Sequence, residues 1–548
     1  MIIFRHLTHF KRYRTVMNVL AHHGFGYITE QISLFRWRKK SKPDYHKYAA
    51  PERARMALEQ LGPTYIKLGQ LLSTRPDIIP RAFITEFEKL QDKTIPIPFA
   101  DIQTVFENNG LSIEANFTYI ENEPIATASI GQVHRARLIN GEEVAVKVIK
   151  PGVREVIKID LEILMELARL AEKRTRWGSL YQVVEIAQEF AEALINELDF
   201  TREGRNADQF RKDFHRNSDV LIPKVYWNLT TKNVLTMEYI EGIKVSDVDS
   251  LRKAGFNLQR VATIIVESFF SQVYEVGFFH ADPHPGNLAV SPQEKVIFYD
   301  FGQMGTVDVL LKERGMDLIQ SMVRYDVNGV TRAILSLGFA KGHINREEFR
   351  RDVSRLQRKY YGIPMADIQL GIALAELIQL TFKYQIRVPP ELSLMVKMLM
   401  TCESLVCQLD ADLSLLELFE PMGHKIIMKR YAPDNIRKKL SDAAIEYATM
   451  ARNLPREVET ILELMGEGEL KLQLEIAGIK NFVKRADILT NRISVSIVAA
   501  GLIVGTALAS GRLSHTLLSQ VPLAELGFVA ALVLGLFLIV SIVRSGRF

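Results

Sequence analysis

The chain has 548 residues, 47% of them hydrophobic and 24% charged, which leaves room for several domains and a large core. Its two cysteines exclude a disulfide scaffold, and the spacing of Cys402 and Cys407 excludes a zinc motif, so we expect buried structural thiols in a reducing compartment. The formal charge is only +5 but is unevenly placed: residues 1–42 hold nine Lys or Arg and a single acid, Glu30.

Residues 1–48 form a basic segment that we expect to be helical. Basic residues interrupt it before an apolar core of useful length forms, which argues against a signal peptide. Aromatic side chains alternate with the bases, as in Phe35-Arg36-Trp37-Arg38. This pattern suits an anionic membrane surface. A nucleic-acid contact and a plain solvated face are the alternatives, and we expect no nucleic-acid partner for the chain.

Residues 49–115 are predicted to be a helical extension. Pro63 suits a first helical position, and the helix should run to about Ser73. Within it, Lys67 and Gln70 are three residues apart and share a face. Gly69 weakens a helix relative to alanine, which indicates that another group packs closely against it. The alternative is an ordinary surface helix with one exposed Lys and Gln.

Residues 116–242 read as the small lobe of a kinase. Two apolar strands flank Asn140-Gly141, the strongest short hairpin signal. The second of these strands contains Val144-Ala-Val-Lys147, which fits the strand lysine that grips the α- and β-phosphates of ATP. The predicted strands are Phe117–Ile120, Val133–Leu138, Glu143–Ile149 and Val234–Tyr239.

A candidate nucleotide loop precedes the hairpin. It has the spacing of G-x-G-x-x-G-x-V, with alanine in place of the first two glycines. Glycine lets backbone N–H groups approach phosphate, whereas the methyl group of alanine restricts that approach. The loop is therefore predicted to be present but altered. The residues expected to contact the nucleotide are Ala126, Ala128, Ser129, Gly131 and Val133 of the loop, with Glu238 and Tyr239 of the hinge.

Lys147 needs a glutamate partner, and the sequence offers several. Glu162 and Glu166 lie on the helix that follows Pro151. A second acidic cluster spans residues 197–203, beginning with Glu197, and can be reached only if a helical insertion separates it from the strand. The residues alone leave this choice open.

The chemistry is predicted around residues 280–302. A largely apolar helix, Val261–Val276, leads into His280-Ala-Asp282-Pro-His-Pro-Gly-Asn287, and a strand, Lys295–Tyr299, leads into Asp300-Phe-Gly302. This is the kinase order H-x-D-x-x-x-x-N followed by D-F-G. Asp282 would orient the nucleophile, and Asn287 and Asp300 would hold Mg²⁺ on ATP. A proline-rich loop whose polar residues only cap turns is the alternative.

These motifs together resemble the UbiB/ADCK family of atypical kinase-like proteins over roughly residues 50–420. The features that carry the resemblance are Lys67-Leu-Gly69-Gln70, the alanine loop, Lys147, Glu197 with Asp199, and the two Asp motifs. The resemblance implies that the Lys67 helix covers the nucleotide site where a peptide substrate would lie. It favours Glu197 as the partner of Lys147, and it implies a role in ubiquinone or related prenylquinone biosynthesis at a membrane.

Residues 243–425 are predicted to form the helical large lobe, with Pro389-Pro390 at one helix boundary. After Gly302 there is no A-P-E motif and little room for a long activation loop, which argues against ordinary protein phosphorylation. Residues 426–490 are charged and mostly helical by composition, and we expect them to be a linker.

Residues 491–546 are predicted to cross a membrane twice. Ile493–Ser510 and Leu526–Val543 are uncharged, and about 18 residues at about 1.5 Å each approach the thickness of the hydrocarbon layer. Gly501 and Gly505 would allow close helix packing; a buried soluble hairpin is the alternative. Basic residues lie outside the hairpin, which favours an inner-membrane protein with its kinase-like domain in the cytoplasm. These basic residues are Lys484, Arg485, Arg492, Arg544 and Arg547, against Arg512 in the loop.

The sequence thus predicts an α+β, two-lobed protein-kinase-like fold with an N-terminal helical extension and a C-terminal transmembrane hairpin. The predicted function is that of a membrane-anchored kinase or ATPase using ATP and Mg²⁺, with Asp282, Lys147, Glu197 and Lys67 as catalytic residues. Membrane lipids, quinone-biosynthesis enzymes and prenylquinone intermediates are the expected partners. A protein kinase and a nucleotide-sensing scaffold with little catalysis remain as alternatives.

Overall fold

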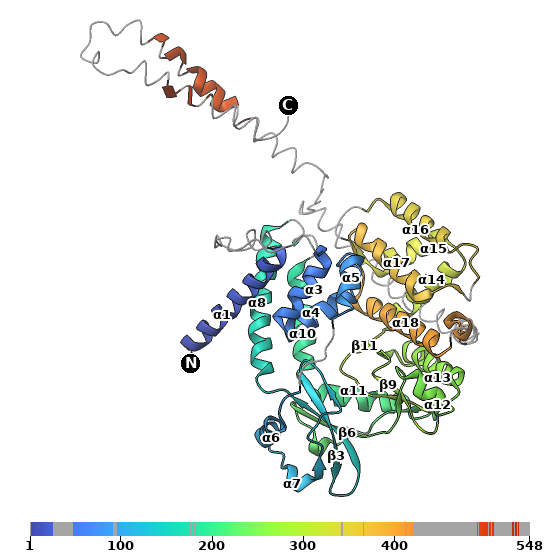
Figure 1. Cartoon of the computed structure of the whole chain (residues 1–548). Coiled ribbons are helices and arrows are strands. Elements are labelled where there is room, and N and C mark those ends of the chain that lie inside the picture. Colours follow the sequence, from blue (N-terminus) through green and yellow to red (C-terminus); the bar gives the residue numbers. More distant parts are fainter. Residues whose placement is uncertain are drawn as a thin grey trace, which may run out of the picture. The chain divides into compact units, whose positions relative to one another are not determined.

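The computed structural model describes residues 2–25, 48–90, 96–175, 178, 182–340, 344–364, 367–410, 413–419, 422 and 490, with short helical pieces between 493 and 535. The chain forms two compact units, Met1–Ala432 and Pro433–Phe548. The first unit contains the helical extension and both lobes (Figure 1). The predicted linker, 426–490, lies outside the described residues apart from residue 490.

The small lobe is an antiparallel sheet in the order β1-β3-β4-β6, with β2 paired to β3. Val144, Val146 and Val148 are fully buried, so Lys147 points to the opposite face of its strand. Gly141 has φ +89°, which favours glycine in the hairpin turn. The four predicted strands are confirmed to within two residues. The strands are β1 (Phe117–Ile120), β2 (Ala126–Thr127), β3 (Gly131–Leu138), β4 (Glu143–Ile149) and β6 (Val234–Glu238).

The helices described between β4 and β5 form the insertion that the sequence requires. They are α8 (Val153–Arg174), α10 (Val183–Glu197) and α11 (Phe200–Asp213). The side chain of Asp199 accepts hydrogen bonds from the amide and hydroxyl of Thr201 and thereby caps α11. Two residues separate α10 from α11, so Glu197 and Glu203 of the acidic cluster lie on two separate helices.

Helices α1 and α4 of the N-terminal extension pack on α8 and α10, and Figure 1 shows them in blue near those helices, whereas α6 and α7 lie beside the small-lobe sheet. The predicted helix at Pro63–Ser73 is confirmed as α4. A Cβ on Gly69 would lie 2.2 Å from a methyl carbon of Leu90 and 2.8 Å from one of Leu58, so the predicted close packing is also confirmed. The extension consists of α1 (Ile2–Leu20), η1 (Ala21–Phe25), α3 (Ala50–Leu61), α4 (Pro63–Ser73), α5 (Arg81–Phe87), α6 (Phe99–Asn108) and α7 (Ile113–Asn116).

Part of the basic N-terminal segment belongs to the folded core. Val16 is fully buried and packs with Leu61 and Ile163. Arg12 donates hydrogen bonds to both carboxylate oxygens of Asp160, at 2.7 and 2.9 Å, and Asp160 is fully buried. Arg12 therefore ties α1 to α8. The membrane-surface prediction cannot apply to this arginine, and residues 26–47 lie outside the described residues.

The large lobe begins with short strands and continues as helices. Its four-stranded sheet has the order β5-β10-β9-β7, and β8 pairs with β11 and β12 with β13. The strands are β5 (Val220–Leu221), β7 (Ile243–Lys244), β8 (Phe278–His280), β9 (Leu288–Val290), β10 (Val296–Phe298), β11 (Met304–Thr306), β12 (Phe339–Ala340) and β13 (Ile386–Arg387). The helices are α12 (Val248–Lys253), α13 (Leu258–Phe270), η4 (Ser271–Val276), α14 (Val309–Val323), α15 (Val327–Leu337), α16 (Arg346–Tyr360), α17 (Leu370–Lys383) and α18 (Pro390–Leu409). The short helix η3 (Trp227–Leu229) packs on β6 of the small lobe.

Helix α18 is the central element of the large lobe. It packs against α13, α17 and β11, and it begins at the predicted proline boundary. The buried carboxylate of Glu403 accepts hydrogen bonds from the amides of Leu370 and Gly371, which start α17. Cys402 is buried as predicted, but Cys407 is exposed on the same helix, so its predicted burial is wrong. Five residues along a helix turn a side chain to a different face.

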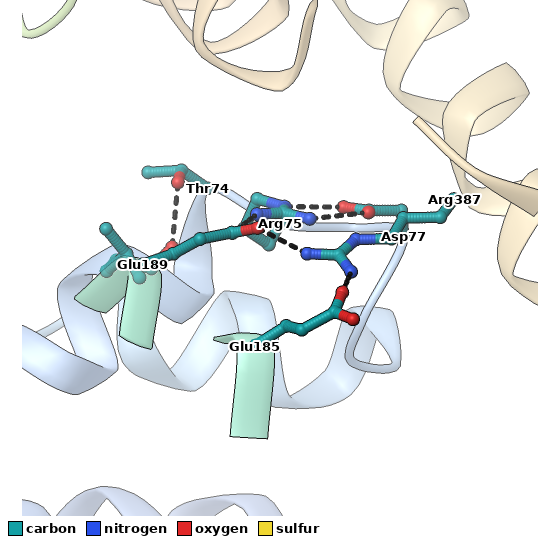
Figure 2. A network of polar contacts seen from close by, with 7 residues as sticks. Thr74, Arg75, Asp77, Glu185, Glu189 and Arg387 are labelled. Atoms are coloured by element: carbon teal, nitrogen blue, oxygen red, sulfur yellow. Dashed lines mark hydrogen bonds and ion pairs between the residues drawn. The ribbon is translucent and has the colours of Figure 1, made fainter. Parts of the chain in front are cut away.

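A polar network joins the extension, α10 and the large lobe (Figure 2). Arg75, only 4% exposed, bonds both oxygens of Asp77 at 2.9 Å and one oxygen of Glu189 at 3.0 Å. Arg387 of β13 bonds the same Glu189 and also Glu185, the latter at 2.6 Å. Glu189 therefore bridges two arginines that are more than 300 residues apart in the sequence.

The predicted transmembrane hairpin is not confirmed. Among the described residues, α18 is the one helix long and apolar enough to span a membrane, and half of its apolar window is buried inside the first unit. A shorter apolar helix, Ile493–Gly505, coincides with the first predicted segment. Of the second segment, only residues 529–530, 532–533 and 535 are described, and these are helical.

Candidate functional site: a kinase-like nucleotide site

Backbone pairing brings the two Asp motifs together. Strand β8 ends at His280 and pairs with β11, so that His280 lies opposite Met304. The amide of Ala281 bonds the carbonyl of Gln303 at 3.0 Å, one residue beyond the Asp300-Phe-Gly302 motif. Both motifs are thereby fixed at the ends of one short ladder.

Asn287 and Asp300 lie at the same end of the β9–β10 hairpin. Leu288 pairs with Phe298, and the carbonyl of Asn287 accepts from the amide of Tyr299 at 3.1 Å. The predicted strand before Asp300 is confirmed as β10. Two predicted metal ligands thirteen residues apart are therefore adjacent, and each presents a side-chain oxygen.

The loop from Asp282 to Asn287 is closed by its own hydrogen bonds. The amide of Asp282 bonds Nδ1 of His280 at 3.2 Å, and the side-chain amide of Asn287 bonds the carbonyl of Asp282 at 3.1 Å. The amide of Asn287 bonds the carbonyl of His284 at 2.8 Å. Proline-rich sequence thus produces an ordered turn that fixes the backbone of Asp282.

Lys147 pairs with Glu203, the last acid of the predicted cluster at residues 197–203. Its Nζ lies 2.8 Å from each carboxylate oxygen of Glu203 and 4.0 Å from Oδ1 of Asp300. Glu203 stands in the first turn of α11 and is 6% exposed. The assignment of Glu197 as the partner of Lys147 is therefore wrong, as are the alternatives Glu162 and Glu166.

Glu197 pairs instead with Lys67. Oε1 of Glu197 lies 2.6 Å from Nζ of Lys67, and the two side chains are 27% and 12% exposed. Glu197 is the last residue of α10, whereas Glu203 follows the break at Asp199, so the two glutamates reach different lysines. The charge of Lys67, like that of Lys147, lowers the pKa of Asp300.

These charges determine the protonation of the site. For Asp300, burial disfavours the carboxylate, but Lys147, the amide of Gly302 and Lys67 outweigh burial and lower its pKa to about 2. For Lys147, burial disfavours the ammonium, yet Asp300 and Glu203 raise its pKa above the ordinary value. Burial raises the pKa of Glu203 to about 7, against the opposing charge of Lys147. Lys147 and Asp300 are therefore both charged at neutral pH.

The nucleotide loop is tight and short. Ala126 and Thr127 pair with Val133 and Gln132 of β3, and the amide of Ala128 bonds the carbonyl of Gly131 at 2.8 Å. A Cβ on Gly131 would lie 2.7 Å from the carbonyl oxygen of Val148, so a glycine is required there.

Ser129 of this loop is 2% exposed, and among the described residues its hydroxyl has no hydrogen-bond partner. An orphaned hydroxyl in this loop is consistent with a phosphate ligand, because a buried polar group normally finds a partner.

Glu238 and Tyr239 lie where β6 leaves the small lobe. The amide of Tyr239 bonds the carbonyl of Glu143, and a carboxylate oxygen of Glu238 accepts from the amide of Lys224 at 3.1 Å. The guanidinium of Arg135 lies 4.5 Å from the ring centre of Tyr239. These side chains thus have structural contacts of their own, and their predicted nucleotide contacts stay predictions.

The catalytic-loop carboxylate also has a partner that the sequence did not indicate. Nζ of Lys397, on α18, lies 2.9 Å from Oδ1 of Asp282. Burial disfavours the carboxylate of Asp282, but Lys397 outweighs burial and holds its pKa below the ordinary value. A lysine 115 residues downstream carries no local signal that could link it to Asp282.

The donor set fits a magnesium ion carried by a nucleotide. Among the described residues, no group of three or more His, Cys, Asp or Glu could hold a metal by itself. Mg²⁺ usually takes one or two protein carboxylates and completes its shell with phosphates and water. Asp300 and the side-chain oxygen of Asn287 provide such a partial site beside Lys147.

The comparisons with known proteins agree with this geometry. The ABC1 atypical kinase-like domain matches residues 89–334, the UbiB helical domain residues 353–414, and the ABC1/UbiB kinase-like C-terminal domain residues 477–544. A probable protein kinase UbiB from Marinobacter nauticus is 33% identical over 83% of this chain and 85% of its own length. The chain belongs to the UbiB/ADCK family.

Other relatives extend over most of this UbiB/ADCK protein. An uncharacterised protein from Clostridium pasteurianum is 31% identical over 98% of this chain and 99% of its own length. The chloroplast protein ACTIVITY OF BC1 COMPLEX KINASE 7 of Arabidopsis thaliana is 34% identical over 79% of this chain and 64% of its own. The solved Rv3197–erythromycin complex from Mycobacterium tuberculosis is 22% identical, with a TM-score of 0.44, over 66% of this chain and 93% of that chain.

Proposed function

We propose that this UbiB/ADCK protein binds Mg-ATP and acts as an atypical kinase or ATPase that supports ubiquinone or related prenylquinone biosynthesis at a membrane. The observation that carries the proposal is the cluster of Lys147, Glu203 and Asp300, with Asn287 at the same hairpin end as Asp300. It reproduces the parts that phosphoryl transfer requires of a protein.

Each residue has a role that follows from its position. Lys147, held by Glu203, would bind the α- and β-phosphates, and Asp300 with Asn287 would hold Mg²⁺. When bound, the metal would neutralise charge on the phosphates. Asp282 would orient the incoming hydroxyl or water. Ser129 would donate its free hydroxyl to a phosphate.

A protein-kinase activity is the second candidate, because the Marinobacter relative is named a probable protein kinase. Two features argue against it. Only six residues separate Gly302 from α14, which begins at Val309, so no long activation loop can support a peptide. The helix that carries Lys67 also pairs with Glu197, whose charge acts on Lys147. A small hydroxyl compound or water suits this arrangement better than a peptide.

A turnover assay distinguishes an ATP-dependent enzyme from a nucleotide-sensing scaffold. The purified full-length chain should hydrolyse ATP or transfer phosphate, and Asp282→Ala should abolish turnover while Mg-ATP still binds. Equal turnover by the wild type and Asp282→Ala would leave the nucleotide-sensing scaffold as the better account. Mass-spectrometric quinone profiling of a deletion strain, complemented with wild type or with Asp300→Asn, tests the biosynthetic role: only the wild type should restore quinone.

Membrane association is proposed on the apolar C-terminal segments, with the kinase-like unit on the cytoplasmic side of the inner membrane. Removal of residues 491–548 should release the protein into the soluble fraction and leave nucleotide binding intact, because the nucleotide motifs end at Gly302. Full membrane retention of the truncated chain would contradict anchoring by this segment and would instead indicate residues 1–48.

A further inference from the structure

Lys397 is held in place by a helix that belongs to the large-lobe core. Its neighbours Val396 and Met398 are both 4% exposed, so burial on either side limits the movement of the helix at this point. Glu403, further along α18, bonds the first amides of α17 and fixes the helix against its neighbour. The ammonium group of Lys397 thus extends from a rigid support.

The backbone of Asp282 is fixed independently by His280 and Asn287. The remaining freedom of this residue is the rotation of its carboxylate, and Lys397 engages one oxygen, Oδ1, at 2.9 Å. No described residue other than Lys397 forms an ion pair or a side-chain hydrogen bond with this carboxylate. The two side chains are 31% and 29% exposed, so a reactant can reach the pair.

Other charges around this pair come from several elements. His280 and His284, on the catalytic loop, act on Asp282 with the same sign as Lys397. From the N-terminal extension, Glu88 at the end of α5 experiences the charge of Lys397. The lysine thus lies among groups from the extension, the catalytic loop and the large lobe. A lysine that served only solubility would extend freely into solvent, whereas Lys397 stands on a buried helix and pairs with Asp282.

We propose that Lys397 is a positioning residue for Asp282, which it holds by Oδ1 so that Oδ2 faces the incoming nucleophile. It also places a fixed positive charge on the side of the site where that nucleophile arrives. The inference rests on the proposed function and deepens it, because it assigns the helical part of the large lobe a direct role in aligning the reaction. Alignment matters since small misplacements of an orienting group slow a reaction strongly.

The test uses the full-length chain and steady-state ATP turnover. Lys397→Met should lower kcat by about tenfold to a hundredfold, with KM for ATP and the affinity for Mg-ADP changed less than about twofold, because Lys397 contacts no group assigned to the nucleotide. Lys397→Arg should recover most of kcat, since it restores the cation. In the Asp282→Asn background, Lys397→Met should change kcat less than about twofold, because the effect passes through Asp282.

A matched control is Lys359→Met. Lys359 of α16 forms a similar pair with Glu376 at 2.7 Å, in the same lobe but outside the site, and its removal should leave kcat unchanged. Thermal unfolding of each variant reports whether the fold survives; if Lys397→Met unfolds, Lys397→Gln and Lys397→Arg take its place. A folded Lys397 variant with wild-type kcat overturns the inference, as does an equal further loss in the Asp282→Asn background.

The same experiment separates the two proposals. If Asp300→Asn abolishes turnover but Lys397→Met keeps the wild-type kcat, the positioning role is refuted and the proposed function stands. Absence of wild-type turnover above the Asp300→Asn background would refute the proposed enzymatic function, and the positioning role with it. The Mg-ADP titration gives a binding readout for Lys397→Met that does not depend on activity.

Discussion

Nζ of Lys147 lies 2.8 Å from both carboxylate oxygens of Glu203, whereas Glu197, six residues earlier, reaches Lys67. The acidic cluster is thus divided between two functions. Glu203 pairs with Lys147, which would bind the phosphates, and Glu197 pairs with Lys67 of the N-terminal extension. The break at Asp199 produces this division.

The two glutamates should therefore respond differently to substitution. Glu203→Gln should reduce the free energy of unfolding by about 3 kcal/mol and weaken Mg-ATP binding, because it breaks a buried ion pair. Glu197→Gln should cost about 1 kcal/mol or less, since Glu197 is 27% exposed. Denaturant titrations and nucleotide titrations of both variants measure these effects. Equal losses in the two variants would contradict the division.

The nucleotide loop should control the choice of nucleotide. The amide of Ala128 is bonded to Gly131, so it does not point at a phosphate as a glycine-rich loop would allow. Ala128→Gly should relax this turn, shift the preference between ATP and ADP, and raise autophosphorylation. Lys67→Ala should alter the same measurements, with Asp300→Asn as the inactive control. Wild-type affinity, selectivity and phosphorylation in both variants would reduce the loop and the Lys67 helix to structural roles.

In the polar network of Figure 2, Arg75 should contribute more to the free energy of unfolding than Arg387 does. Arg75→Leu leaves the fully buried carboxylate of Asp77 unpaired and should cost about 3–5 kcal/mol of unfolding free energy. Arg387→Leu removes a partly exposed contact with Glu185 and Glu189 and should cost about 1 kcal/mol. Chemical denaturation measures both, and a larger loss for Arg387 would contradict the assigned order.

Glu403 should make stability depend on pH. Burial raises its pKa to about 7, despite the two amide hydrogen bonds that favour the carboxylate. The folded state therefore keeps the proton to higher pH than the unfolded chain does. The stabilisation that protonated Glu403 provides is complete below its unfolded-state pKa of about 4.3. It is lost as the pH rises toward 7, by at most about 1.4 kcal/mol per pH unit. Glu403→Gln should flatten this slope in thermal melts, and an unchanged slope would contradict the assignment.

Local spacing in the sequence indicates the residues that the structure brings together around Lys147 and Asp300. The Val144-Ala-Val-Lys147 motif indicates Lys147, and kinase-motif spacing indicates Asp282, Asn287 and Asp300; the roles of these residues stay predictions. The close packing at Gly69 follows from the rarity of glycine within a helix. The partner of Lys147 did not follow, because the chain breaks between α10 and α11 near residue 199, and Glu197 and Glu203, six residues apart, lie on different helices and pair with different lysines. Lys397 could not be predicted, since only tertiary packing brings α18 to Asp282.

Calorimetric titration of Mg-ATP into the wild type and Asp300→Asn tests the central claim most directly. The account predicts magnesium-dependent binding to the wild type and at least about a tenfold loss of affinity in Asp300→Asn, because the substitution removes an anionic metal ligand. Asp308→Asn is a matched control: Asp308 caps α14 at the nearby surface, and asparagine caps equally well, so its affinity should not change. Equal Mg-ATP affinity in the wild type and Asp300→Asn would contradict a kinase-like nucleotide site.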